Sequence, residues 1–172
     1  MFSIIIPTYN NLDYLKLCLN SIKKNSFYEH EIIIHINEGT DGTIDYLKQL
    51  KYKTTYSQIN SGVCTAFNKA VEKSTMEYVV LAHDDMYFCP GWDEVFFTEL
   101  SQLPKNSDFF LSGTMVQPFE SYINLNCGKN IDEFDENKLL TELPKIKFKD
   151  FQGTHWQPSL IPVKTWNKVA GF

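Results

Sequence analysis

The pattern of apolar and polar positions divides the first half of the chain into alternating strands and helices. Apolar or β-rich runs at 2–6, 31–36 and 53–57 predict three strands, and a fourth run, Tyr78–Ala82, lacks the polar alternation of a half-exposed strand. Between them, apolar residues recur at helical spacing in three groups: Leu12, Leu15, Leu19 and Ile22; Ile44, Leu47 and Leu50; Val63, Ala66, Phe67 and Ala70. Three strand-helix units in a row predict the α/β class, with a mostly parallel sheet flanked by helices.

The second half of the chain has a less regular pattern. The elements expected there are a helix carrying Val95, Phe96, Leu100 and Leu103, a strand at 109–115, a short helix with Leu139, Leu140 and Leu143, a strand at Ser159–Val163 and a helical turn at 164–169. The stretch 117–150 has no clear period and resembles an insertion on the same sheet. No repeat or linker divides the chain, so we expect one domain over 1–172.

The loops after the first, second and fourth predicted strands are polar. Parallel strands end at one edge of a sheet, so these loops should bring Thr8-Tyr9-Asn10, Asn37-Glu38 and Asp84-Asp85 together. In open α/β sheets that edge is where ligands bind. The asparagines of the first loop are also suited to cap the helix that follows, and Asp41 and Thr43 suit the start of the next one.

The acids that end the fourth strand suggest a metal. Asp84 and Asp85 repel each other unless a cation or a proton relieves them, and a hard divalent ion with oxygen ligands that bridges substrate phosphates would do so. His83 could ligate manganese as a neutral imidazole or could be a structural residue that forms hydrogen bonds. The alternative interpretation of the whole stretch is an Asp-rich turn with solvated charges.

Composition narrows the function further. The chain has 172 residues and a formal charge of −5, which disfavours nucleic acid as a partner. All 16 basic residues are lysines, so no guanidinium can clamp a phosphate, which leaves metal, Lys or backbone amides. The four cysteines form no Cys-x-x-Cys pair, as expected of reduced thiols in the cytoplasm. The sequence shows neither a leader peptide nor a membrane-spanning stretch, so we expect a cytoplasmic protein. The alternative is peripheral association with the inner face of the membrane through regions missing from this sequence.

Several segments, in this order, resemble glycosyltransferase family 2. They are Ser3–Asn10 (SIIIPTYN), Glu31–Ile34 with Gly39–Thr43 (GTDGT), Asn60-Ser61-Gly62 with Ala66 and Asn68, and Asp85 followed by Pro90-Gly91. The resemblance implies a GT-A (Rossmann-like) fold and inverting transfer of a sugar from a nucleotide-sugar, with Mn²⁺ or Mg²⁺. It places nucleotide-sugar binding in 1–116 and the start of an acceptor-side part in 117–172.

The resemblance also implies roles for single residues. Pro7, Thr8, Tyr9 and Asn10 would border the nucleoside, and Asp85 would stand for the last acid of the family's Asp-x-Asp metal motif, with His83 in place of its first acid. Asn37, Glu38, Asn68 and Asp84 are further candidates for nucleotide binding. Asn68 has an alternative role in holding a neighbouring loop, and Tyr9 in packing.

Two departures from the family bear on specificity. Where the family usually places an Asp against the base, this chain has Ile36, so the hydrogen bond would come from Asn37 or Glu38 or be missing. Phe67 replaces the Arg often found before the helix Asn. A UDP-sugar is the favoured donor, and these departures leave the identity of the base open.

The candidates for the acceptor site and the catalytic base lie near the end of the sequence. Ala170-Gly171-Phe172 resembles the beginning of the family's Gly-Gly-Phe-Asp segment, whose downstream acid is the catalytic base. We expect that acid beyond Phe172, so that this chain binds donor but transfers sugar poorly; Asp150 and His155 are weak substitutes. His155 and Trp156 form a candidate sugar platform for the acceptor, with simple packing as the alternative.

Three functions remain open on sequence alone. The first is a metal-dependent sugar transferase acting on a saccharide or lipid-linked acceptor in polysaccharide biosynthesis. The second is a sugar-1-phosphate nucleotidyltransferase, disfavoured because Pro7–Asn10 contains no glycine. The third is a non-catalytic or truncated nucleotide-sugar-binding domain, which His83 favours. Turnover of a nucleotide-sugar, as against binding without turnover, separates the first from the third.

Overall fold

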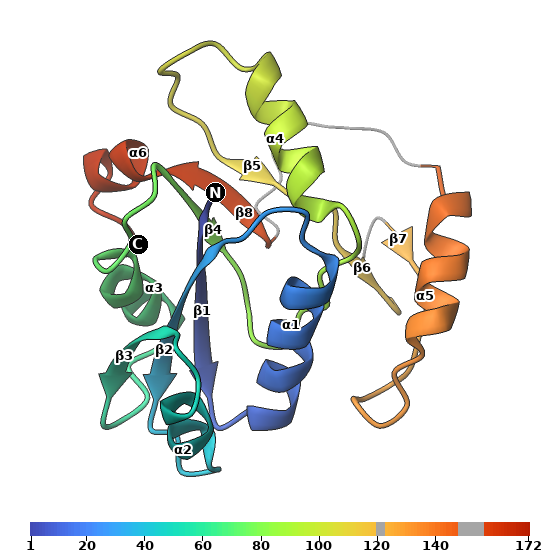
Figure 1. The fold of residues 1–172 in the computed structure, drawn as a ribbon, viewed down its shortest axis with the longest axis horizontal. Helices are drawn as coiled ribbons and strands as arrows, with labels where there is room; N and C mark the ends of the chain where they lie inside the picture. The colour runs from blue at the N-terminus through green and yellow to red at the C-terminus, as the bar shows by residue number, and fades with distance from the viewer. Residues whose placement is uncertain (120–122, 148–156) are drawn as a thin grey trace.

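A six-stranded sheet forms the centre of the computed structural model, which describes residues 1–119, 123–147 and 157–172 (Figure 1). Its strands are β1 (Ser3–Tyr9), β2 (Glu31–Asn37), β3 (Lys53–Ser57), β4 (Tyr78–Leu81), β5 (Leu111–Ser112) and β8 (Ser159–Pro162), in the order β3-β2-β1-β4-β8-β5. Strands β1 to β4 are parallel to one another, whereas β8 runs antiparallel to β4 and β5. The predicted α/β class and the mostly parallel sheet are confirmed.

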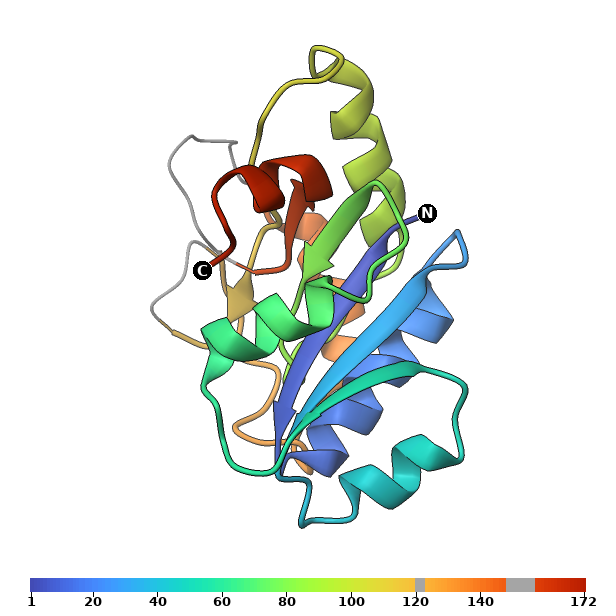
Figure 2. The ribbon, with the colours of Figure 1, turned by 90° about the vertical axis from the view of Figure 1, so that its left-hand side faces the viewer.

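Helices cover both faces of this sheet. The first face packs against α1 (Leu12–Asn25), α2 (Thr43–Lys48) and α4 (Trp92–Gln102), and the second against α3 (Val63–Val71) and α6 (Val163–Lys168). In Figure 2, α3 and α6 stand on one side of the sheet and α1 on the other. None of the helices in the described ranges is long and apolar enough to cross a membrane.

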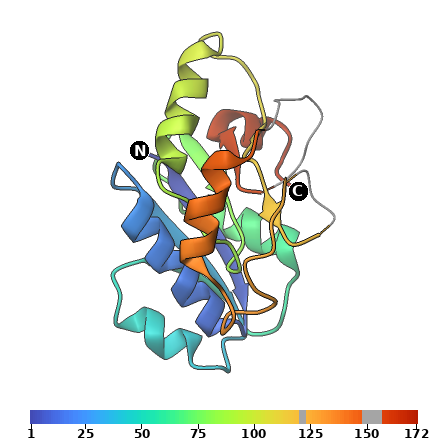
Figure 3. The ribbon, with the colours of Figure 1, turned by 90° about the vertical axis from the view of Figure 1, so that its right-hand side faces the viewer.

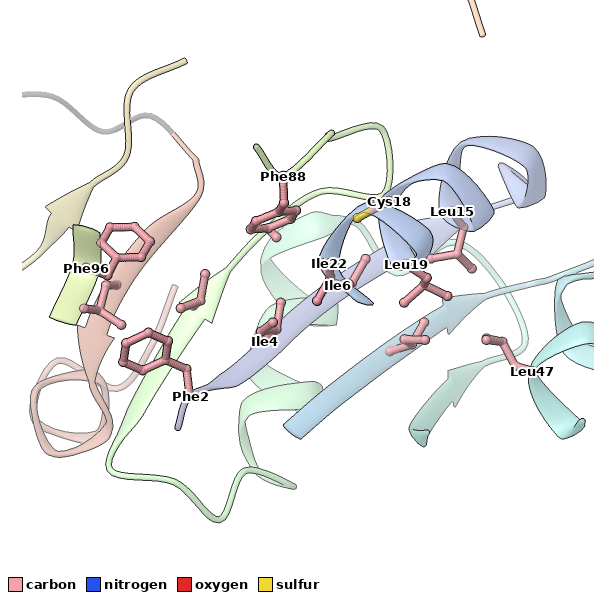
Figure 4. Close-up of a cluster of buried hydrophobic side chains, with 14 of the residues drawn as sticks. Phe2, Ile4, Ile6, Leu15, Cys18, Leu19, Ile22, Leu47, Phe88 and Phe96 are labelled. Atoms are coloured by element: carbon pink, nitrogen blue, oxygen red, sulfur yellow. The ribbon is translucent and has the colours of Figure 1, made fainter. Parts of the chain in front are cut away.

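The central strands are apolar without alternation because each face has its own core. Ile4 and Ile6 of β1 pack with Leu15 and Leu19 of α1 in the first core, which Figure 4 shows. Ile5, between them in sequence, belongs to the second core. Successive side chains of a strand point to opposite faces, so a strand with both faces covered must be apolar at every position.

The less regular region forms a small unit beside the first face. Strands β6 (Val116–Gln117) and β7 (Ile123–Asn124) pair with each other in a second sheet, and α5 (Glu136–Glu142) leads into a 3-10 turn, η1 (Leu143–Lys145). Lys24 of α1 binds Glu136 at 2.7 Å, and Figure 3 shows α5 in front of α1 and α4. In the described ranges this region does not extend the main sheet, contrary to our expectation.

Three further expectations are wrong in detail. The strand expected at 109–115 pairs only at Leu111 and Ser112, because the chain turns away after Gly113 donates a hydrogen bond to the Pro158 carbonyl. Val63 and Val95, expected to face inward, are exposed at the first turns of α3 and α4.

The expected asparagine cap of α1 is also wrong. Asn11 makes no side-chain cap. The backbone N–H of Leu12 instead donates to Asp41 Oδ2 at 2.8 Å, from the loop that precedes α2.

Candidate functional site

A cleft of about 240 Å³ opens at the carboxyl edge of the sheet. It is lined by Pro7, Thr8, Tyr9, Asn11, Asn37, Asn60, Gly62, Val63, His83 and Asp84. Strands β1, β2 and β4 are parallel neighbours and end together there, so residues from distant parts of the sequence meet. Six of the predicted site residues line this cleft.

Asp84 carries the negative charge that faces the cleft. Its Oδ1 accepts a hydrogen bond from Asn11 Nδ2 at 3.1 Å. Burial raises the pKa of Asp84 above its ordinary value and the charge of Asp85 adds to this, while Thr8 and Asn11 act in the opposite direction. The Thr8 hydroxyl is buried and makes no hydrogen bond of good geometry, although it lies near enough to Asp84 to lower that pKa. The site therefore holds an unpaired hydroxyl beside a partly desolvated carboxylate.

Asp85 and His83 differ in their surroundings. Asp85 is exposed, and its carboxylate makes no hydrogen bond or ion pair with the described residues. The His83 ring lines the cleft and meets the ring of Phe67 edge-on, with centroids 5.8 Å apart. This contact fits the structural role that the sequence left open for His83.

Asn10 and Glu38 hold the edge of the cleft rather than line it. Asn10 Oδ1 accepts from the Thr40 backbone at 2.8 Å, and Asn10 Nδ2 donates to Glu38 Oε2 at 3.4 Å. Glu38 Oε1 in turn accepts from the Asn60 backbone at 3.3 Å. Both residues have positive φ, 47° and 59°, a conformation that such contacts must stabilise. They connect the loops after β1, β2 and β3.

Asn37 is the residue of the second strand end that does line the cleft. It is buried, and its Oδ1 accepts two hydrogen bonds from Ser61, one from the backbone N–H and one from the hydroxyl, each 2.9 Å long. Ile36, at the position where the family usually has an Asp, packs into the first core. Of the two polar residues considered in its place, Asn37 is the one that reaches the cleft.

A group of polar side chains that the sequence analysis did not identify lies under this part of the cleft. We call His35, Thr55, Ser57 and Lys69 the polar cluster. His35 is fully buried, with Nδ1 2.7 Å from Thr55 Oγ1 and Nε2 3.1 Å from Ser57 Oγ, and Lys69 Nζ donates to Ser57 Oγ at 2.7 Å. Polar residues alternate along both strands: His35 and Asn37 on β2, Thr55 and Ser57 on β3. Alternate residues share one face of a sheet, so this pattern in the sequence indicates a polar face.

Asn68 is not in the cleft. Its Nδ2 donates to the Phe172 carbonyl at 2.9 Å and its Oδ1 accepts from the Phe172 backbone at 3.1 Å. It lines a separate hollow of about 570 Å³ between α3 and α6, together with Trp166. That hollow is larger, but it lies away from the strand ends and the acids. The alternative role of Asn68, holding a neighbouring segment, fits this geometry better than nucleotide contact.

The remaining predicted residues lie outside the described part of the chain. They are Asp150, His155 and Trp156. Asn11, Asn60 and Gly62 line the cleft without having been singled out as ligand-binding residues. Asn11 was interpreted only as a helix cap.

Comparison with known proteins identifies the chain. The sequence profile of Glycosyl transferase family 2 matches residues 3–113, which is more than half of the chain. The chain belongs to glycosyltransferase family 2. The family suggested by the sequence motifs is thereby confirmed.

Relatives and solved structures agree with this family and fold. The glycosyltransferase TuaG of Bacillus subtilis, provisionally assigned to teichuronic acid biosynthesis, is 29% identical over 140 residues, covering 78% of this chain and 52% of TuaG. Staphylococcus aureus TarS in complex with UDP-GlcNAc superimposes with a TM-score of 0.69 at 17% identity, over 98% of this chain and 47% of that one. The mannosyltransferase PcManGT from Pyrobaculum calidifontis, in complex with GDP-Man and Mn²⁺, gives 0.68 at 18% identity, over 99% and 47%.

These comparisons confirm a GT-A fold for this chain. The chain spans about half the length of these relatives.

GT-A glycosyltransferases commonly use a divalent metal, and the residues of this site fit one only in part. No three His, Cys, Asp or Glu side chains in the described ranges lie close enough together to hold a metal ion by themselves. The raised pKa of Asp84 and the exposed carboxylate of Asp85 beside it nevertheless mark a place where positive charge would be stabilising. Such a donor set suits Mn²⁺ or Mg²⁺ whose remaining ligands are water and substrate phosphate.

Proposed function

We propose that this chain binds a nucleotide-sugar in the cleft and transfers the sugar, with inversion, to a saccharide or lipid-linked acceptor in polysaccharide biosynthesis. The observation that carries the proposal is the polar cleft at the carboxyl edge, where the buried Thr8 hydroxyl lacks a partner beside the Asp84 carboxylate. A buried polar group without a partner is costly unless a ligand or water completes it. Membership of the family and its bound relatives support the same donor class.

The nucleoside would lie against the ends of β1 and β2. Pro7 and Thr8 line the cleft, and Tyr9, which is half exposed, would stack its ring on a base or ribose. Asn37 offers the hydrogen-bonding group nearest the base, while Asn10 and Glu38 fix the loops. TarS with UDP-GlcNAc favours a uridine donor, and PcManGT with GDP-Man keeps guanosine as an alternative.

The diphosphate would lie toward the end of β4. Asp85 is the main candidate to hold a divalent ion, Mn²⁺ or Mg²⁺, with Asp84 beside it and His83 as a further ligand. When bound, the ion supplies positive charge to the diphosphate leaving group. The chain contains no Arg that could take over this role. Asp84 is held by Asn11, so its own part would be to orient the ligands around the diphosphate.

A second candidate function is nucleotide-sugar binding without transfer. It is favoured by His83 in place of the first acid of the metal motif and by the absence, among the described residues, of three clustered metal ligands. Asp150 and His155 remain the candidate bases in this chain, and His155 and Trp156 the candidate acceptor platform. Release of UDP that depends on an acceptor sugar would decide for transfer. Transfer that is lost in Asp150→Asn or His155→Ala would assign the base.

A binding experiment tests the donor site directly. Thermal shift with UDP-, GDP- and dTDP-sugars, with and without Mn²⁺, should show stabilisation by at least one donor that increases with metal. Asp85→Asn should abolish the metal-dependent part of nucleoside diphosphate affinity in calorimetry, and Asp84→Asn should reduce it less. Asp13→Asn, which removes an exposed acid of α1 that pairs with Lys16, is the matched control. Unchanged affinity in Asp85→Asn with saturating metal would contradict the assignment.

A further inference from the structure

The buried face of α1 carries three polar side chains among its apolar ones. Cys18, Ser21 and Asn25 are 0%, 2% and 8% exposed, and spacings of three and four residues place them on one side of the helix. Burying a polar group costs free energy unless it finds a hydrogen-bond partner. Their partners outside the helix belong to the segment 83–91, which follows β4 and carries the two acids. We call this segment the acid loop.

The acid loop is attached to α1 on both sides of the acids. Before them, the Cys18 thiol donates to the His83 carbonyl, with 3.5 Å between sulfur and oxygen. After them, the Phe88 backbone N–H donates to Ser21 Oγ at 2.9 Å, and the Phe88 carbonyl accepts from Asn25 Nδ2 at 2.7 Å. The helix therefore holds both backbone groups of one buried loop residue.

The direction of each hydrogen bond around Asn25 follows from chemistry. A carbonyl can only accept, so the Asn25 atom 2.7 Å from the Phe88 oxygen must be the amide nitrogen. The same nitrogen donates its second hydrogen to the Tyr87 hydroxyl oxygen at 2.9 Å. Tyr87 donates its own hydrogen to Glu136 Oε1, because an ionised carboxylate can only accept. A continuous chain of hydrogen bonds thus runs from α1 through the acid loop to α5.

Glu136 begins α5 in the small unit beside the first face. It also accepts from Lys24 Nζ at 2.7 and 2.9 Å, but that pair is exposed, with 58% and 35% of the two side chains accessible. Exposed ion pairs contribute about 0–1 kcal/mol. The Tyr87 ring, in contrast, packs against Phe134 just before α5, with centroids 5.2 Å apart. Tyr87 is therefore the contact through which the small unit reaches the acid loop.

We propose, resting on the donor site proposed above, that Asn25 and Tyr87 are positioning residues for metal-dependent donor binding. Asn25 sets the place of Asp85 through the backbone of the acid loop, and Tyr87 makes that place depend on the docking of α5. Neither residue is among those that line the cleft, so each acts through the loop. A loop released on one side presents Asp85 correctly in a smaller fraction of molecules, and the apparent affinity falls by that fraction.

Calorimetry of UDP binding with saturating Mn²⁺ and with EDTA tests this role. The ratio of the two affinities, the metal enhancement, isolates the binding that runs through the ion. Tyr87→Phe removes one hydroxyl and keeps the ring against Phe134. It should lower the metal enhancement about threefold to tenfold, as expected for one hydrogen bond. Asn25→Ala removes both hydrogens of the junction and should lower it by at least about tenfold.

Variants of Glu136 test the chain from its far end. Glu136→Ala removes the acceptor of the Tyr87 hydroxyl and should lower the metal enhancement as much as Tyr87→Phe does. Combining the two changes should cause no further loss, because both break the same contact. Glu136→Gln keeps an oxygen that can accept from Tyr87 and should retain the metal enhancement of the unmodified chain.

Two further variants are matched controls. Lys24→Gln removes the exposed ion pair with Glu136 and leaves the hydrogen bond from Tyr87 in place. Leu19→Ala, on the same helix, removes a core side chain that is 2% exposed and should lower the urea midpoint more than Tyr87→Phe does. Both variants should keep the full metal enhancement at a temperature where they remain folded.

The outcomes separate this proposal from the donor site itself. Failure of the unmodified chain to bind UDP with Mn²⁺ would overturn the donor site and the proposal together. If that chain binds, an unchanged metal enhancement in Tyr87→Phe and Glu136→Ala would overturn the proposal alone. A loss in Leu19→Ala equal to that in Tyr87→Phe would do the same, since overall stability would then explain both. If Asn25→Ala does not fold, the Tyr87 and Glu136 variants still decide.

Discussion

The hydrogen-bond partners of a buried residue determine its protonation state, as His30 shows. His30 Nδ1 accepts from the Phe2 backbone N–H at 3.1 Å, so the ring cannot carry a proton there. His30 Nε2 lies 3.0 Å from Asp93 Oδ2 and must be the N–H that donates. Burial would raise the pKa of Asp93, but hydrogen bonds from the Tyr28 and Phe27 backbones and from His30 lower it. The contact is thus a neutral imidazole on a carboxylate rather than an ion pair.

This residue-scale chemistry predicts a dependence of stability on pH. Burial lowers the pKa of both His30 and His35 below their ordinary value of 6.5. Below 6.5 the unfolded chain therefore binds more protons than the folded chain, and the free energy of unfolding should fall as the pH falls through that value toward the folded pKa. The urea midpoint should be lower at about pH 5.5 than at about pH 7.5, and His30→Gln and His35→Gln should each reduce the difference. An unchanged difference in both variants would contradict this account.

Between elements, two helix starts share one capping residue. Asp41 Oδ2 accepts from the Leu12 backbone at the start of α1, and Asp41 Oδ1 accepts from the Thr43 backbone at the start of α2, at 3.1 Å. Burial would raise the pKa of Asp41, but these hydrogen bonds lower it. A carboxylate also complements the positive end of each helix dipole. The loop after β2 is thereby attached to the loop after β1, next to the cleft.

Replacing this shared cap should destabilise the fold. Asp41→Ala leaves the first N–H groups of both helices without their acceptor, and the free energy of unfolding should fall by about 0.5–2 kcal/mol. Asp45→Asn is the control, because Asp45 is exposed and pairs with the exposed Lys48 one turn later in α2. That change should cost about 0–1 kcal/mol. Urea denaturation measures the free energy of unfolding of both variants. Equal losses would show that Asp41 does not stabilise the two helix starts.

The contact between α3 and the segment after α6 depends on a glycine. Gly171 has φ of 75°, and a Cβ there would lie 2.1 Å from Asn68 Oδ1. Relieving that overlap would move Asn68 away from the two hydrogen bonds it makes with Phe172. Backbone conformation and close approach both require glycine at this position.

Gly62 provides the matched comparison, because it has φ of 79° with nothing within 4 Å of its Cβ position. Gly62→Ala should cost about 1–3 kcal/mol for the backbone conformation alone, since φ of 79° with ψ of 161° is a region that only glycine adopts readily. Gly171→Ala should cost about 1–3 kcal/mol more, from the two lost hydrogen bonds. Thermal or urea denaturation of the two variants gives this difference directly. Equal destabilisation would indicate that Asn68 moves aside without loss.

At the scale of the whole molecule, the two cores differ in whether a phenylalanine of the core contacts a residue of the cleft. Phe67 of the second core contacts the His83 ring in the cleft and the Phe172 ring, with centroids 5.8 Å apart in each case. Phe96 of the first core packs against Trp92 and Phe2, in the part of that core that Figure 4 draws at the Phe2 end of β1. One phenylalanine thus supports the cleft directly and the other does not.

Replacing Phe67 and Phe96 one at a time distinguishes an effect on stability from an effect on binding. Phe67→Ala and Phe96→Ala should each lower the free energy of unfolding by about 3–5 kcal/mol. Only Phe67→Ala should also weaken nucleoside diphosphate binding, because His83 loses the ring that holds it. Calorimetry at a temperature where both variants remain folded makes the comparison. Equal loss of affinity in both would mean that the cleft depends on overall stability rather than on this contact.

The sequence by itself determined the order of elements and the place of the site. Periodicity is a local property, so the strands at β1 to β4 and the helices between them could be predicted from neighbouring residues. The edge where Thr8, Asn37 and Asp84 meet followed from the parallel arrangement alone. The family motifs supplied the activity class.

Only the tertiary structure decided how individual side chains are used. It showed that Asp84 rather than Asp85 lines the cleft, that Asp41 instead of Asn11 caps α1, and that Asn68 holds Phe172. It also revealed the polar cluster and the orientation of the Asn37 amide. The physical reason is common to all of them. Each depends on a hydrogen bond or packing contact between residues far apart in sequence, and periodicity carries no information about such partners.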